Sequence, residues 1–132
     1  MDIKEYISKV RKMPEAFVPD GRMDHYWYLL HGHLTTNRMN KMNYEQNEKF
    51  SLYFTKWLWA WVRTRVDKNY ELRSLYWHHI IEDVTDSESE ARALFFELCD
   101  EFFQLNEETL QEIIDAADEL DNEDDEDDED DE

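Results

Sequence analysis

The sequence predicts an all-α fold, a single compact bundle of about five to six helices followed by a disordered acidic C-terminal tail. Apolar residues recur at intervals of three and four along most of the chain, which is the spacing of one helix face. Glycine and proline number two each, and the turns of β-hairpins usually require them. The 132 residues suffice for one domain with a core. We assign the helical domain to residues 1–120 and the tail to residues 121–132.

The first two predicted helices have recognisable start signals. Asp2 caps the first helix, with Glu5 three residues later as in a capping box. Pro14 ends this helix, because proline disfavours helical geometry in the residue before it. The segment EAFVPDG that follows is predicted to be a loop, and Asp24 caps the second helix. The expected inward residues of the two helices are Ile3, Tyr6, Ile7, Val10, Trp27, Leu30, His31 and Leu34.

The third predicted helix covers about residues 44–66 and is the most aromatic part of the chain. Its large rings recur at steps of three and four residues, so we expect it to form the centre of the core. A fourth helix is predicted over about residues 71–82. The aromatic stripe of the third helix consists of Phe50, Phe54, Trp57 and Trp61.

Two further helices follow in the acidic half. The fifth opens at a capping box, formed either by Thr85 with Glu88 or by Ser87 with Glu90. Asn106 caps the sixth. Both helices carry apolar residues on one face and carboxylates elsewhere. Their expected inward residues are Ala91, Leu94, Phe95, Leu98, Phe102, Leu105, Leu110, Ile113, Ile114 and Ala117.

Charge is divided unequally along the chain. Residues 81–132 contain 25 Asp or Glu and the single base Arg92, whereas residues 1–80 contain 13 Lys or Arg and nine Asp or Glu. Because no apolar residue follows Leu120, burial cannot offset the entropy of ordering residues 121–132, and we predict disorder there. The formal net charge of −20 disfavours direct binding to nucleic acid, whose phosphates repel it, and favours a basic protein partner.

We expect a cytoplasmic protein without membrane association. The opening MDIKEYISKV lacks the apolar core of a signal peptide. The apolar stretch at residues 57–62 is far shorter than the roughly 20 residues that span a bilayer. The single cysteine, Cys99, excludes an internal disulfide framework. Its acidic neighbours disfavour a thiolate, so we expect an inert thiol.

Residues with catalytic or metal-binding potential are sparse. The pair His78-His79 stands four residues before two acids, Glu82 and Asp83. Such neighbours share a helix face, yet a metal site needs three or four ligands. The chain has no glycine-rich phosphate loop and no nucleophile motif. We therefore predict that the protein is not an enzyme and holds no cofactor and no metal. A metal-dependent enzyme that uses these histidines is the alternative.

The sequence predicts an acidic partner-binding surface. Carboxylates fixed on a helix imitate the phosphates of nucleic acid, so they can occupy the cleft of a basic nuclease or DNA-binding protein and accelerate association. Trp77 is a candidate aromatic anchor, with packing in the core as its alternative. We expect the bases near the third helix to pair with the acidic half, a nucleic-acid platform being the alternative. The predicted acids are Glu82, Asp83, Asp86, Glu88, Glu90, Glu97, Asp100 and Glu101.

Four segments carry a resemblance to a known group of proteins. They are IKEYISKVRKMP near the start, YLLHG at residues 28–32, WHHII at residues 77–81 and EARALFFELCDEF at residues 90–102. In this order, over about residues 3–105, they resemble small acidic immunity-type proteins of bacterial polymorphic toxin or contact-dependent inhibition systems. The segment KMPEAFVPDG departs from the turn of that pattern. The resemblance implies a protein that neutralises a cognate toxin, and its matching positions are mainly apolar.

Other functions stay open at this point. A phage-encoded nucleic-acid mimic that inhibits a restriction or CRISPR-type defence protein would act through the same acidic surface. An acidic chaperone for basic proteins would act through the tail. The sequence leaves open the oligomeric state and the identity of the partner.

Overall fold

The computed structural model describes the backbone of residues 1–71 and 76–130, and the side chains of residues 1–71 and 76–119. Within these ranges the chain forms seven helices and no strand, so the predicted all-α class is confirmed. The helices are α1 (Ile3–Lys12), α2 (Pro14–Phe17), α3 (Met23–Met39), α4 (Glu45–Arg65), α5 (Trp77–Asp83), α6 (Glu88–Gln104) and α7 (Glu107–Asp130).

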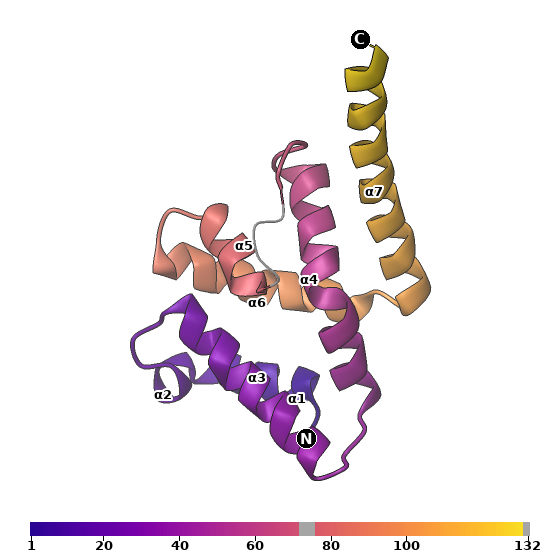
Figure 1. Ribbon diagram of the computed structural model, residues 1–132. Helices are drawn as coiled ribbons and strands as arrows, with labels where there is room; N and C mark the ends of the chain where they lie inside the picture. The colour runs from indigo at the N-terminus through magenta and orange to yellow at the C-terminus, as the bar shows by residue number, and fades with distance from the viewer. Residues whose placement is uncertain (72–75, 131–132) are drawn as a thin grey trace.

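Helix α4 lies at the centre of the arrangement (Figure 1). On one side α7 packs along the C-terminal part of α4, and its far end projects away from the other helices. On the other side α1, α2 and α3 form the N-terminal part of the bundle. The short helix α5 packs against both α3 and α6, while α6 crosses behind α4 and leads to α7. The start of the acidic half is thereby placed next to the start of α3.

Three of the predicted helix starts are confirmed as side-chain caps. Asp2 accepts a hydrogen bond from the backbone N–H of Glu5 at 2.9 Å, and Asn106 accepts one from the residue three positions later at 2.8 Å. The choice left open for the fifth predicted helix is resolved in favour of Ser87, whose hydroxyl accepts from the N–H of Glu90 at 3.2 Å. Thr85 instead donates its hydroxyl to a carbonyl of α5. Local polar chemistry therefore determines these helix starts.

The second predicted helix differs in its start and its buried face. The residue before α3 is Arg22, which makes no side-chain cap, and Asp24 lies inside the helix. Tyr26 is fully buried, whereas His31 is exposed. The prediction of His31 as an inward residue was wrong, because the buried face of α3 runs through Met23, Tyr26 and Leu30. The predicted loop EAFVPDG also begins with a single turn of helix, α2.

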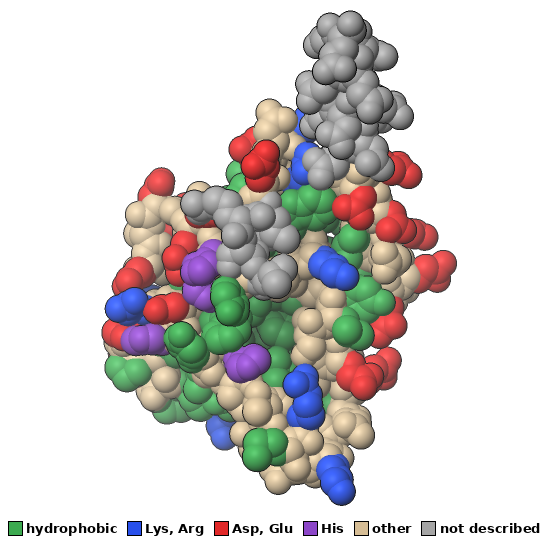
Figure 2. Space-filling model, viewed as in Figure 1, with side chains coloured by type: hydrophobic (Ala, Val, Ile, Leu, Met, Phe, Trp, Pro, Cys, Tyr) green, Lys and Arg blue, Asp and Glu red, His purple; other side chains and the backbone are tan. Residues whose placement is uncertain are grey.

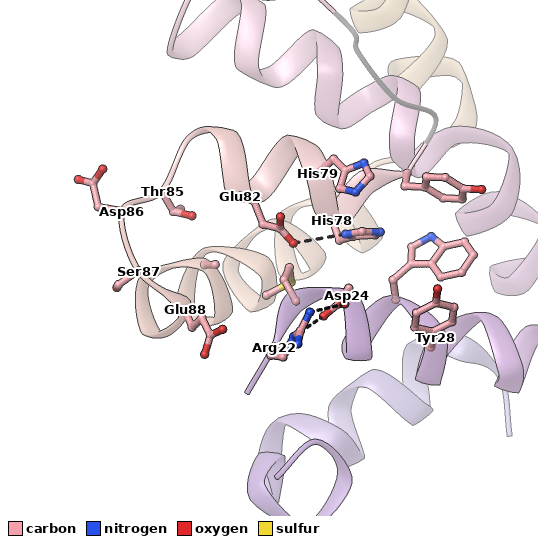
Figure 3. Close-up of a pocket in the computed structure, with 14 residues that line it drawn as sticks. Arg22, Asp24, Tyr28, His78, His79, Glu82, Thr85, Asp86, Ser87 and Glu88 are labelled. Carbon is pink, nitrogen blue, oxygen red and sulfur yellow. Dashed lines mark hydrogen bonds and ion pairs between the residues drawn. The ribbon is translucent and has the colours of Figure 1, made fainter. Parts of the chain in front are cut away.

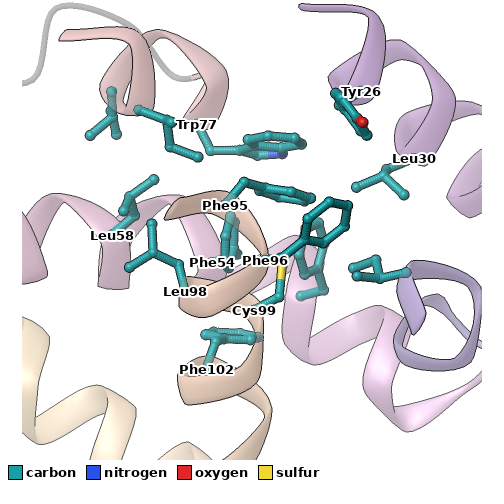
Figure 4. Close-up of a cluster of buried hydrophobic side chains, with 14 of the residues drawn as sticks. Tyr26, Leu30, Phe54, Leu58, Trp77, Phe95, Phe96, Leu98, Cys99 and Phe102 are labelled. Atoms are coloured by element: carbon teal, nitrogen blue, oxygen red, sulfur yellow. The ribbon is translucent and has the colours of Figure 1, made fainter. Parts of the chain in front are cut away.

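Aromatic rings from α4, α5 and α6 form the core (Figure 4). Trp77 of α5 stacks on Phe95 of α6, with ring centroids 4.7 Å apart and planes 11° from parallel. Phe54 of α4 meets Phe102 of α6 edge to face, with ring centroids 5.1 Å apart. The predicted role of the third helix as the centre of the core is thus confirmed for Phe54 and Trp57, which are fully buried, whereas Trp61 is only half-buried.

Two predictions fall partly on residues that the structure does not describe. The predicted helix over residues 71–82 is observed only from Trp77, as α5, because Glu71 and Tyr76 are not helical. Residues 72–75 lie outside the described ranges. Helix α7 continues through residues 121–130, where we predicted disorder, but the side chains beyond residue 119 are not described, so disorder stays a prediction. In the described part of the chain, no helix combines the length and the apolar composition that crossing a membrane requires.

Candidate partner-binding surface

A cleft of about 900 Å³ opens between the N-terminal half of α3, helix α5 and the start of α6 (Figure 3). We refer to it as the α3–α5–α6 cleft. Its walls combine carboxylates, imidazoles and aromatic rings that come from three separate parts of the sequence. The lining residues are Arg22, Met23, Asp24, Trp27, Tyr28, Tyr76, His78, His79, Glu82, Thr85, Asp86, Ser87, Glu88 and Ala91.

Four carboxylates and one guanidinium line this cleft. Arg22 donates two parallel hydrogen bonds to Asp24, from Nε and Nη2, at 3.1 and 3.0 Å. Burial acts to raise the pKa of Asp24, yet the hydrogen bonds and charge of Arg22 outweigh it and lower that pKa. Glu82 lies across the cleft from this pair, Glu88 lies at the end of the cleft nearer Arg22, and the carboxylate of Asp86 points outward (Figure 3). The four carboxylates outnumber the one guanidinium, so the cleft is negatively charged.

His78 forms the inner wall of the cleft and is only 7 % exposed. Its Nδ1 lies 3.4 Å from Oε1 of Glu82, one helical turn later. Burial lowers the pKa of His78 below its ordinary value, and the nearby Glu82 offsets this effect only in part. The ring is therefore neutral at neutral pH, and it adds no positive charge to the cleft.

Aromatic rings form one end of the cleft. Trp27 meets Tyr28 and Tyr76 edge to face, at centroid distances of 5.2 and 4.9 Å. Tyr28 is 65 % exposed and Tyr76 is 46 % exposed. Exposed tyrosines beside a cleft are typical of surfaces that bind another protein, because a rigid ring loses little entropy on binding. The aromatic rings and the carboxylates thus lie next to one another in the same cleft.

The structure brings three of the predicted acids together and separates the others. Glu82, Asp86 and Glu88 all line the α3–α5–α6 cleft. Glu90 and Glu97 line a different depression of about 320 Å³ beside Trp61, Val84 and Leu94. Glu97 follows Glu88 by nine residues, which is about half a turn around a helix beyond two full turns. The predicted surface is therefore two patches on opposite sides of α6.

Three other predicted acids are engaged inside the molecule. Asp100 forms an ion pair with Arg11 of α1 at 2.5 Å, and Glu101 forms one with Arg65 of α4, also at 2.5 Å. Asp83 accepts a hydrogen bond from the hydroxyl of Tyr70 at 2.8 Å. These contacts show bases of the N-terminal half pairing with acids of the C-terminal half. They hold α6 against α1 and α4 and leave these carboxylates less available to a partner.

Trp77, the candidate anchor, lies in the core. It is 5 % exposed, and its ring stacks on Phe95. A ring at this depth presents no face to a docking protein, so the structure favours the packing alternative. The cleft offers other aromatic side chains instead, Trp27, Tyr28 and Tyr76, which the sequence-based prediction missed. Tyr28 falls outside the apolar stripe of its helix. An aromatic residue at such a position is expected to be exposed, and this was the signal in the sequence.

The thiol of Cys99 and the potential metal ligands are the other reactive groups of the described residues. Cys99 is buried among core residues, and burial raises its pKa well above the ordinary thiol value, with the adjacent Asp100 adding to the effect. Across residues 1–71 and 76–119, no three His, Cys, Asp or Glu side chains come close enough to share a metal ion.

Comparison with known proteins adds no relative, since no protein-family model, no curated protein and no solved structure matches the chain. The charge and geometry of the described residues are therefore the basis for assigning a function.

Proposed function

We propose that this protein is a cytoplasmic immunity protein. It binds a basic cognate toxin domain, a nuclease, and covers the active or substrate-binding surface of that domain with its acidic surface around α5 and α6. The observation that carries the proposal is a set of exposed carboxylates on α6 and on the segment that leads into it. Asp86, Glu88 and Glu97 are exposed, and their carboxylates form no hydrogen bond or ion pair with any residue that the structure describes.

Fixed, solvated carboxylates suit the inhibition of a nucleic-acid enzyme. A nuclease must present a positive cleft to its phosphate-rich substrate, and an acidic protein surface can compete for the same cleft. Acidic side chains gather at two margins of the molecular surface, over α7 and around the connection between α5 and α6 (Figure 2). This distribution supports long-range attraction followed by specific contact at the α5–α6 connection.

The internal ion pairs divide the predicted acids into two roles. Asp86, Glu88, Glu90 and Glu97 are exposed on the α5–α6 connection and α6, so we assign them to the partner. We assign Asp100 and Glu101 to internal stabilisation, since each binds a base of the N-terminal half. The predicted disordered tail, residues 121–132, would extend the distance over which a basic partner is attracted.

Capture of the partner tests this proposal. The affinity-tagged full chain is mixed with the basic product of the adjacent gene, and complex formation and nuclease activity are measured together. A complex of one copy of each protein that abolishes nuclease activity is the expected result. The same complex formed with a restriction or CRISPR-type protein, and not with a toxin, would contradict immunity and support the nucleic-acid mimic. Capture of neither partner would contradict both.

A further inference from the structure

We propose that the α3–α5–α6 cleft is a receptor for one arginine side chain of a protein partner. This inference deepens the proposed function and rests on it in one respect, the basic character of the partner. The cleft combines two elements that recognise a guanidinium group, exposed aromatic rings and carboxylates that converge from different helices.

The aromatic rings provide the first element. Tyr28 belongs to α3 and Tyr76 immediately precedes α5, and both meet the edge or face of Trp27 at nearly right angles, 84° and 87°. Contact with Trp27 restricts the orientation of the two exposed tyrosines before any partner arrives. A guanidinium group stacks favourably on such a ring because the face of the ring carries negative charge density.

The carboxylates provide the second element. Asp24 comes from α3, Glu82 from α5 and Glu88 from the first turn of α6, and all three line the cleft. The rim already binds one guanidinium, since Arg22 holds Asp24 through two parallel hydrogen bonds. This is the bidentate geometry by which carboxylates recognise arginine. The carboxylate of Glu88 forms no hydrogen bond or ion pair with a described residue, and that of Glu82 lies 3.4 Å from Nδ1 of His78. Both line the cleft and can receive a second guanidinium from outside (Figure 3).

Other occupants fit the cleft less well. Its excess of carboxylates disfavours phosphate, and no three potential metal ligands among the described side chains are close enough to hold a cation. A lysine ammonium is strongly hydrated and lacks a planar group that stacks on tyrosine. The volume of about 900 Å³ leaves room for an arginine side chain together with the flanking backbone of the protein that carries it.

The test uses small probes that differ in one property. The full chain is titrated with N-acetyl-arginine amide, N-acetyl-lysine amide and N-acetyl-citrulline amide, and binding is followed by NMR at the indole N–H of Trp27 and the backbone amides of the cleft. Citrulline has nearly the shape of arginine but no charge. We expect saturable shifts confined to the cleft, about fivefold tighter for arginine than for lysine, and none for citrulline. Shifts spread over the acidic face of α7 without saturation, or equal for arginine and citrulline, would overturn the proposal.

Two variants and one control complete the test. Tyr28→Ala removes an exposed ring and Glu82→Gln removes one carboxylate, and each should weaken arginine-amide binding about threefold or more. Glu112→Gln removes an exposed carboxylate of α7 that does not line the cleft, and it should leave this binding unchanged. Because the probe contains no toxin, arginine binding without toxin capture would contradict the proposed function alone. Toxin capture that is unaffected by Tyr28→Ala and Glu82→Gln would contradict the arginine receptor alone.

Discussion

Arg65 and Glu101 form an ion pair across 36 positions of sequence, with Nη2 2.5 Å from Oε1. The same carboxylate accepts a hydrogen bond from the indole Nε1 of Trp61 at 3.2 Å. One acid of α6 is thus bound to two side chains of α4. The pair lies near the surface, with 33 % of the Glu101 side chain exposed, so its contribution to stability is modest.

Replacing this acid should lower stability without weakening partner binding. We expect Glu101→Gln to reduce the free energy of unfolding by about 1 kcal/mol, because a surface ion pair and a charge-assisted hydrogen bond are lost. Urea unfolding measures this change. Glu97→Gln is the matched control, since Glu97 has no such partner among the described residues, and it should change stability by less than about 0.5 kcal/mol. A loss of toxin affinity in Glu101→Gln would instead place Glu101 in the interface.

Substitutions of Trp77 distinguish a role in the core from a role in partner binding. Because this ring is 5 % exposed and stacked on Phe95, Trp77→Ala should cost about 3–5 kcal/mol of stability. The milder Trp77→Phe, which keeps an aromatic ring in the core, allows binding to be measured on a folded protein. We expect partner affinity to stay within about twofold of the wild type. Reduced affinity with unchanged unfolding would show that Trp77 is an anchor after all.

Charge reversal at the start of α6 should slow association. Asp86→Lys combined with Glu88→Lys changes two exposed side chains whose carboxylates form no hydrogen bond or ion pair with a described residue, so the fold should persist. We expect the association rate constant for the toxin to fall about tenfold or more at low salt, and less at high salt, because screening already weakens the attraction there. Surface plasmon resonance at a low and a high salt concentration measures the association rate constant under both conditions. The same reversal at Glu112, exposed on α7, is the control, and equal effects would mean that only net charge matters.

His78 should make stability depend on pH in a defined direction. Its folded pKa lies below the ordinary 6.5 because the ring is buried, so the unfolded chain takes up this proton at a higher pH than the folded chain. Stability is therefore lost as the pH falls through 6.5 toward the folded pKa. Urea unfolding measures this dependence. Between about pH 8 and about pH 5.5, we expect the free energy of unfolding to fall less in His78→Asn than in the wild type. His31→Asn, a substitution of the same kind at an exposed position, is the control.

Deletion of residues 121–132 tests the tail. These residues hold 11 of the 25 acids that follow residue 80, and all the described residues that line the cleft precede them in the sequence. Association with the toxin should slow several-fold at low salt, with little change in the dissociation rate constant. Loss of the complex on deletion would reverse the two roles and favour an acidic chaperone.

Helix starts could be predicted because their signals are local. Asp2, Ser87 and Asn106 each bond to a backbone N–H three residues later, so a few neighbouring letters contain the necessary chemistry. The buried face of α3 was harder to predict, since Tyr26 and Trp27 are both large and aromatic. Packing against Phe95 and Phe96 of α6 determines which of the two is fully buried.

The cleft could not be predicted from helix periodicity. It depends on how α3, α5 and α6 are placed relative to one another, and that placement depends on side chains from all three. By contrast, the separation of Glu88 from Glu97 could have been predicted from the sequence. Nine residues at about 100° each turn a helix face to the opposite side, and this calculation alone divides the acids of α6 into two patches.

The burial of Cys99 has a practical consequence. It is the single thiol in the chain, it is 2 % exposed, and only its thiolate reacts readily with alkylating reagents. A cysteine introduced at an exposed position therefore takes a fluorescent label without competition from the native residue. In the unmodified protein, the slow alkylation of Cys99 reports how often α6 separates from the rest of the core. Its rate therefore measures the opening of the bundle.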